Sequence, residues 1–279
     1  MNSKIKATLR KFLSIALAAL ILAGCAGAAF ADGSDASGTL NGVNWVYTAA
    51  DKTLVFSGSG TLGDGQRESK LFGASWLANH VKIGPDVHSK QGWVFDNFDF
   101  VEAYEVDAYN KYLCNPDGVL MSKDKTVLIK YPAGSKEFSF YTVPDTVKTI
   151  SYGAFEFSSA LKTVFLNDGL ETIDTFAFFN CNNLLYITVP GTVTSMGRGI
   201  FSQCRVLNKV TFEEGVTEVP AEAFDRFRTL ETVVIPESVT TIGEGAFWDC
   251  VKLTTLDHPK TVQTFAASPR RTLGRRNIK

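Results

Sequence analysis

The sequence predicts a solenoid of stacked 23-residue units with a parallel β-sheet along one face. Apolar residues recur every 23 positions, without a gap, from residue 147 to residue 265. Within each unit, apolar and polar residues alternate over a short stretch, which is the period of a strand. Because one unit cannot bury its own apolar face, neighbouring units stack and share a core. One column of that core is entirely phenylalanine: Phe155, Phe178, Phe201, Phe224 and Phe247.

Each unit contains a strand of the form L-x-x-V-x-L, such as Leu161–Leu166. Alternation places Val164 and Leu166 inward, and Thr163 and Phe165 outward. A V-x-x-I pair and a small residue before Phe complete the unit, as in Ala246–Phe247. We expect the small residue to allow close chain approach and the Phe to fill the interior.

The consensus A-F-x-x-C-x-x-L-x-x-V-x-[IVL]-P resembles the BspA-type bacterial leucine-rich repeat over residues 138–265. The resemblance implies a leucine-rich repeat solenoid and a binding role, such as adhesion or host and matrix interaction. Ile200 replaces the consensus Ala in one copy. The Cys column also varies, reading Ser158, Cys181, Cys204, Phe227 and Cys250.

Residues 1–31 are expected to be an export signal, because a basic start precedes the apolar run Phe12–Ala23. Two cleavage sites compete. Residues 22–25 resemble a bacterial lipobox, which would lipidate Cys25 and anchor the chain to a membrane. Ala29–Ala31 is an A-x-A site that would release a secreted protein. Both predict an exported, cell-surface or secreted protein.

Residues 32–77 are predicted to form a small N-terminal β-hairpin module that caps the array, with strands at Trp45–Tyr47 and Thr53–Phe56. Gly58–Gly63 matches G-x-G-x-x-G, but no helix start follows. We therefore interpret it as a turn, and we expect no cofactor.

Residues 78–106 fit the same frame as a degenerate repeat, with Ala78, Val81 and Ile83 in a strand. Residues 107–137 contain an insertion, predicted to be a β-hairpin turning at Lys123–Lys125. Phe138 then opens the regular repeats of residues 138–265, as an inward-facing residue.

Charge is distributed unevenly along the chain. The net charge is −1, but residues 1–24 and 259–279 hold four and six basic residues and no acid. Residues 25–258 contain the remaining 18 basic residues and all 29 acidic residues, which gives this part of the chain a net charge of −11. We expect no nucleic-acid partner. The basic tail, residues 266–279, is interpreted as a solvated end, although an arm for an anionic surface is an alternative.

Catalytic and metal-binding signatures are absent from the sequence. It has three His, at positions 80, 88 and 258, and no H-E-x-x-H, C-x-x-C or G-x-S-x-G motif. We predict a non-enzymatic protein without a metal site. Cysteines of the interior column should be inert structural thiols, with a Cys181–Cys204 disulfide as the lesser alternative.

The outward side of the predicted sheet is the candidate binding face. Every strand contributes a Thr, and aromatics lie near one end. Solenoids bind partners on such extended surfaces, although Thr and aromatics are also good strand formers. The candidate residues are Phe140, Thr163, Phe165, Tyr186, Thr188, Lys209, Thr211 and Thr232.

Three functions remain open at this point. The first is binding of an extracellular protein or glycan through the sheet face. The second is a structural or assembly role in the bacterial envelope. The third is an enzyme with a site in residues 63–137, involving His80 or His88.

Overall fold

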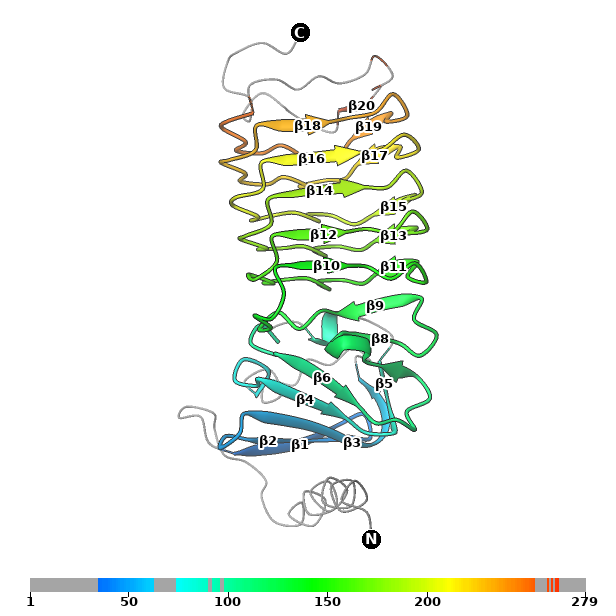
Figure 1. Ribbon diagram of the computed structural model, residues 1–279, viewed down its shortest axis with the longest axis vertical. Coiled ribbons are helices and arrows are strands. Elements are labelled where there is room, and N and C mark those ends of the chain that lie inside the picture. The colour runs from blue at the N-terminus through cyan, green and yellow to red at the C-terminus, as the bar shows by residue number, and fades with distance from the viewer. Residues whose placement is uncertain are drawn as a thin grey trace.

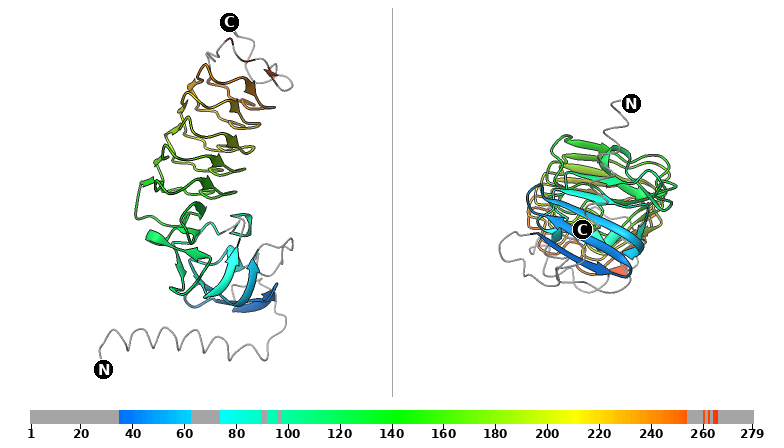
Figure 2. Two further views of the ribbon diagram at one scale, coloured as in Figure 1. Left: turned by 90° about the vertical axis from the view of Figure 1, so that its right-hand side faces the viewer. Right: turned by 90° about the horizontal axis from the view of Figure 1, so that it is seen from below.

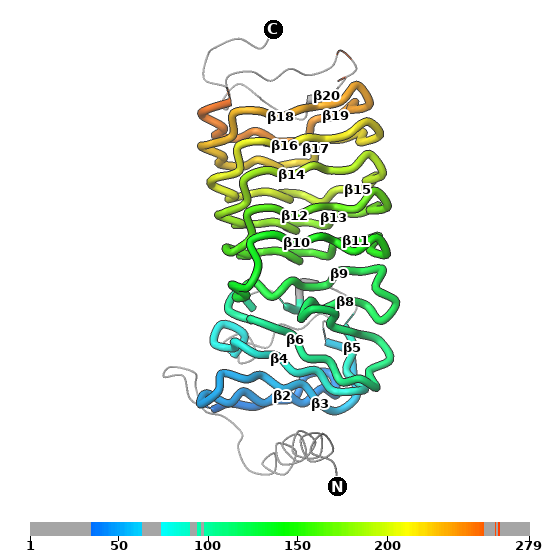
Figure 3. Tube along the Cα trace, viewed as in Figure 1, coloured from blue at the N-terminus to red at the C-terminus, as the bar shows by residue number. Residues whose placement is uncertain are grey.

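The computed structural model describes residues 35–62, 74–89, 92–95, 98–253, 260, 262 and 264–265. The chain forms an elongated stack, with an N-terminal module at one end and regular turns above it (Figure 1). Short strands lie one above another in two columns along the array. The same arrangement is seen from the side and along the long axis in Figure 2, and as a chain trace in Figure 3.

The N-terminal module is a mixed sheet of order β1-β2-β3-β4-β6, with β5 paired to the far part of β3. β1, β2 and β3 pair antiparallel, as the predicted hairpin requires, with one strand more than predicted. β3, β4 and β6 pair parallel, and His80 lies opposite Ala103, one repeat period further along the chain. The degenerate repeat therefore follows the period of the array. The strands are β1 (Ala36–Leu40), β2 (Val43–Thr48), β3 (Thr53–Leu62), β4 (His80–Ile83), β5 (Asp86–Ser89) and β6 (Ala103–Val106).

The interpretation of the glycine-rich segment after Phe56 as a turn was wrong, because Gly58 to Leu62 continue β3. This part of β3 changes partner, since Gly58 ends the pairing with β2 and Ser59 begins the pairing with β5. Gly60 is needed for close approach to the β1–β2 turn, where an added Cβ would lie 2.0 Å from the Asn41 carbonyl oxygen. The glycines therefore allow β3 to exchange its pairing with β2 for pairing with β5.

The inserted hairpin forms between β8 and β9, which pair antiparallel across the predicted turn. β9 then pairs parallel with β11 (Thr149–Ile150), so the hairpin joins the second column of the array. Its side chains alternate between two cores: Leu128 packs with the array and Ile129 packs with the module. The hairpin therefore lies between the two cores and contributes to both. The elements here are η2 (Gly92–Phe95), β7 (Leu113–Cys114), η3 (Pro116–Gly118), β8 (Leu120–Ser122) and β9 (Val127–Lys130).

The array contains one long parallel sheet of order β10-β12-β14-β16-β18. A second column of two-residue strands runs beside it. Neighbouring strands in both columns are offset by one repeat unit, for example Tyr186 opposite Lys209 and Thr149 opposite Thr172. The strands are β10 (Phe140–Thr142), β11 (Thr149–Ile150), β12 (Thr163–Phe165), β13 (Thr172–Ile173), β14 (Tyr186–Val189), β15 (Ser195–Met196), β16 (Lys209–Phe212), β17 (Glu218–Val219), β18 (Thr232–Val234), β19 (Thr241–Ile242) and β20 (Thr264–Phe265).

The phenylalanine column lies inside the array as predicted. Phe155, Phe178, Phe201 and Phe224 have no exposed surface, and Phe247 is 7% exposed. Their rings follow one another through the stack, with Phe155 and Phe178 parallel at 4.9 Å between centroids. Burial of these rings provides a large part of the driving force that holds the turns together.

The prediction that Phe138 faces inward was wrong, because its side chain is 47% exposed. Tyr141 and Val143 do pack into the core, as predicted. The chain reaches β10 from the hairpin rather than from a complete preceding unit. No complete preceding unit therefore covers Phe138, whereas the equivalent residue of the next turn, Leu161, is buried.

The turns behind the sheet repeat an unusual backbone conformation. Two residues per unit have positive φ, in the left-handed region that disfavours side chains other than glycine. One column reads Gly153, Phe176, Gly199, Glu222 and Gly245, and the other reads Phe157, Asn180, Gln203, Arg226 and Asp249. Between these positions, backbone N–H groups donate to the next turn, as from Phe178 to Ile200 at 2.9 Å.

We expect opposite effects from substitutions at two of these positions. Gln203→Gly should stabilise the protein by about 1 kcal/mol, because the left-handed conformation is strained with a side chain. Gly199→Ala should destabilise it, since the added Cβ would meet the Phe176 ring at 2.5 Å at a φ of +62°. Urea denaturation of the two variants measures both changes, and shifts of the same sign would contradict the prediction.

No helix among the described residues is long and apolar enough to cross a membrane.

Candidate binding surface

The outward side of the β10-β12-β14-β16-β18 sheet carries ten side chains, which we call the sheet face. The strand register aligns them in two columns across the turns. One column is Phe140, Thr163, Tyr186, Lys209 and Thr232, and the other is Thr142, Phe165, Thr188, Thr211 and Val234. Between them, the inward residues Val164, Ile187, Val210 and Val233 are buried in the array core. The structure therefore brings all the predicted face residues onto one surface.

Three aromatic rings dominate the face. Phe140 is 57% exposed, Phe165 50% and Tyr186 49%, and they come from three consecutive strands. Val234 adds an apolar side chain at the other end and is 42% exposed. Thr188, Lys209 and Thr232 are exposed and Thr211 is half-buried, which agrees with the predicted orientation.

The expectation that Thr163 is exposed was wrong, because its side chain is 7% exposed. Thr163 lies opposite Phe140 on one side and Tyr186 on the other. Threonine is much shorter than either aromatic residue, so the two rings shelter it. Thr163 separates the rings rather than presenting a surface of its own.

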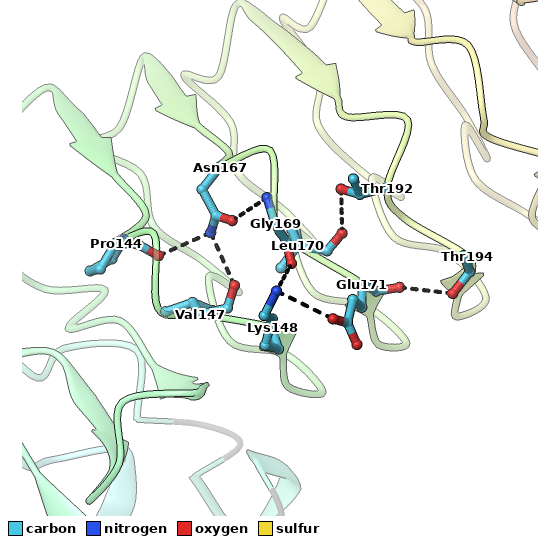
Figure 4. Close-up of polar contacts among 9 residues, drawn as sticks. All are labelled: Pro144, Val147, Lys148, Asn167, Gly169, Leu170, Glu171, Thr192 and Thr194. Carbon is cyan, nitrogen blue, oxygen red and sulfur yellow. Dashed lines mark hydrogen bonds and ion pairs between the residues drawn. The ribbon is translucent and has the colours of Figure 1, made fainter.

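Polar contacts between turns hold the strands in register near this face (Figure 4). The Asn167 side chain donates to the carbonyls of Pro144 and Val147 in the turn below, at 3.0 and 3.1 Å, and accepts from the Gly169 N–H at 2.8 Å. Asn167 is itself buried. It therefore satisfies backbone groups that the turn between strands leaves unpaired.

Three further contacts in Figure 4 also join successive turns. Lys148 donates to the Gly169 carbonyl at 3.0 Å and pairs with Glu171 at 3.3 Å. One turn above, the Thr192 hydroxyl donates to the Leu170 carbonyl at 2.7 Å. Side chains from successive turns thus bridge the stack and fix the spacing of the strands that carry the face.

Cys181 and Cys204 are free thiols, as predicted, and the alternative of a disulfide between them is wrong. Each donates instead to the backbone of the preceding turn: Cys181 to the Phe155 carbonyl at 3.0 Å and Cys204 to the Phe178 carbonyl at 2.9 Å. Burial raises the pKa of the Cys204 thiol well above its usual range and that of Cys250 to about 12. The Cys204 and Cys250 thiols are therefore poor nucleophiles, as predicted for structural cysteines.

The raised thiol pKa values predict a loss of stability at alkaline pH. Below about pH 9 the Cys250 thiol is protonated in both the folded and the unfolded state, and its contribution to stability is fully present. Between about pH 9 and about pH 12 the thiol ionises in the unfolded state but stays protonated in the folded state, so the free energy of unfolding falls as the pH rises. Ser occupies the same column naturally at position 158. The double variant Cys204→Ser, Cys250→Ser should therefore show a weaker decline than the unmodified protein. Urea midpoints measured between pH 8 and pH 11 check this, and parallel curves would contradict it.

His88 contacts the Thr61 hydroxyl, with 2.9 Å from Nε2 to Oγ1. The two residues lie opposite each other in the β3–β5 register, so the contact is a cross-strand pair. The imidazole also packs against the Tyr112 ring at 4.7 Å. The described residues contain no cluster of metal ligands.

The inserted hairpin contains a buried polar cluster that the sequence pattern did not predict. Lys130 is fully buried, and its ammonium donates to the Gly153 carbonyl at 2.7 Å and lies 3.8 Å from Glu156. Burial raises the pKa of the nearby Asp99 carboxyl, although Lys130 opposes that rise. No periodic signal marks Lys130, because it lies in the insertion that interrupts the repeat frame.

Several predicted features lie outside the described residues: the export signal with Cys25, residues 63–73 of the N-terminal module, His258 and the basic tail.

Comparison with protein-family models identifies residues 133–267 as a BspA type leucine-rich repeat region in six copies. A leucine-rich repeat protein from Eubacterium ventriosum matches with 18% identity and a TM-score of 0.55, over 79% of this chain and 90% of that one. A leucine-rich cell surface protein from Faecalibacterium prausnitzii matches with 18% identity and a TM-score of 0.38, over 80% and 76% of the two chains. The pneumococcal vaccine antigen PcpA matches with 23% identity and a TM-score of 0.42, over 60% of this chain and 51% of that one. None of the curated proteins matches this chain.

Proposed function

Because residues 133–267 are a BspA-type leucine-rich repeat region, we propose that this chain is an exported, non-enzymatic cell-surface protein that binds an extracellular macromolecule through its sheet face. The family is one of surface repeat scaffolds, and this supports a binding role and an extracellular location. Export would follow from the signal in residues 1–31, with Cys25 as the lipid anchor or Ala31 as the last residue removed.

The observation that carries the proposal is the exposure of three aromatic rings on adjacent strands. Phe140, Phe165 and Tyr186 are each about half exposed to solvent. A contiguous exposed apolar patch on a rigid surface is typical of a partner site. Aromatic residues also contribute strongly when such a site is covered. Strand propensity would account for aromatic residues on a sheet, but it would account equally for polar strand formers such as Thr. A sheet face that only contacts water therefore has no need of three exposed rings.

The double variant Phe165→Ser, Tyr186→Ser should weaken binding at least tenfold, because it removes two of the three rings. The measurement is a binding screen of the chain against extracellular-matrix proteins and cell-surface glycans, followed by an affinity titration. Trp248→Ser is the matched control, since Trp248 is 54% exposed but lies on a turn outside the sheet.

Unchanged affinity in the double variant would rule out the sheet face as the binding surface. If the folded protein bound no probe at all, a structural role in the bacterial envelope would become the better explanation, and native cross-linking would then identify its neighbours.

A further inference from the structure

The charge of the sheet face differs from that of the rest of the protein. Residues 25–258 have a net charge of −11, yet none of the ten face residues is acidic. Lys209 is the one charged side chain among them. A polyanionic partner would need a basic surface, and a basic partner would need an acidic one. The face offers neither, so its composition favours an uncharged partner.

The face combines flat apolar rings with hydroxyl groups. Phe140, Phe165 and Tyr186 expose their rings, and Thr142 and Thr188 lie exposed beside them on the same strands. Sugar rings have apolar C–H faces that pack on aromatic rings, and hydroxyl edges that exchange hydrogen bonds with threonine. Apart from Lys209 the face carries no charge, and its rings and hydroxyl groups match the two kinds of surface that a sugar ring presents.

The spacing of the face is also regular. Adjacent strands of a sheet lie about 4.8 Å apart, and the three rings come from consecutive strands. Thr163 lies between the rings of Phe140 and Tyr186 and leaves a low point there. Phe165 lies in the other column, on the strand between those of Phe140 and Tyr186, so the three rings are staggered with one ring on each strand. Such a set suits an extended polymer that presents the same group repeatedly. Resting on the proposed binding function, we propose that the partner of the sheet face is an uncharged polysaccharide lying across β10, β12 and β14.

Affinity gel electrophoresis of the full chain tests the proposal. The uncharged probes are laminarin, hydroxyethylcellulose and galactomannan, and the charged probes are heparin and polygalacturonate. We expect at least one uncharged polysaccharide to retard the protein. The double variant Phe165→Ser, Tyr186→Ser should lose at least tenfold in affinity, while Trp248→Ser behaves like the unmodified chain.

Retardation by charged probes alone would overturn the inference. The inference would also be overturned if matrix proteins bound the chain, the double variant lost that binding, and no uncharged polysaccharide retarded the protein. In that case the proposed binding function would still stand. If the folded protein bound neither polysaccharides nor matrix proteins, both the inference and the proposed function would be overturned.

Discussion

Phe201→Ala is expected to destabilise the protein by about 3–5 kcal/mol, because it removes a fully buried ring from the middle of the array. Phe201 packs between Phe178 and Phe224, with ring centroids 5.6 and 5.8 Å away. In a solenoid, each turn is stabilised mainly by its two neighbours. The cavity would therefore weaken both interfaces of one turn and divide the array into two less cooperative parts.

Urea denaturation followed by circular dichroism measures this effect. Phe165→Ala is the control, since it removes the same ring from a half-exposed position on the sheet face. Its expected cost is about 0.5 kcal/mol, the usual size for a surface substitution. Equal effects of the two variants would mean that the inside and outside of the repeat are wrongly assigned.

The sequence predicts the array well because every turn repeats the same physical requirement. A column such as Phe155, Phe178 and Phe201 recurs at a fixed interval only if each member occupies the same place in a shared core. The interval then predicts the register as well: the structure places Tyr186 opposite Lys209, its equivalent in the next repeat. The orientation of the sheet face follows from simple alternation.

The exceptions arise where a residue depends on neighbours that the repeat does not specify. Thr163 points outward, but the sizes of Phe140 and Tyr186 bury it, which alternation does not take into account. Phe138 fits the column of Leu161 but belongs to the first turn, where no complete unit covers it. Pairing between β9 and β11 was likewise not predictable, because the hairpin lies outside the frame.

The burial of Lys130 was also not predictable from the repeat, and substitution of this residue is expected to cause a large loss of stability. It lies on β9, two residues after Leu128, so it faces the array core, where its ammonium donates to Gly153 at 2.7 Å. Burying a charge is costly unless it is paired and hydrogen-bonded, and Lys130 has both Gly153 and Glu156 as partners. These contacts fasten the inserted hairpin to the first turn of the array.

Lys130→Ala should cost about 3 kcal/mol, because it leaves a cavity in the core, removes one of the two hydrogen bonds to the Gly153 carbonyl and breaks the ion pair with Glu156. Lys148→Ala is the matched control. Lys148 also donates to a carbonyl, that of Gly169, and pairs with Glu171, but its side chain is 47% exposed. Water replaces those contacts when Lys148 is removed, so the expected cost is below about 1 kcal/mol.

Equilibrium unfolding of both variants compares a buried and an exposed lysine that each donate to a carbonyl and pair with a glutamate. Hydrogen exchange adds the location of the change, since loss of Lys130 should increase exchange at β8, β9 and β11 before the distant β16 and β18. If Lys130→Ala and Lys148→Ala cost the same, burial does not decide the strength of this contact. The hairpin would then be held to the array by its apolar residues, such as Leu128 and Met121, which pack in the same core.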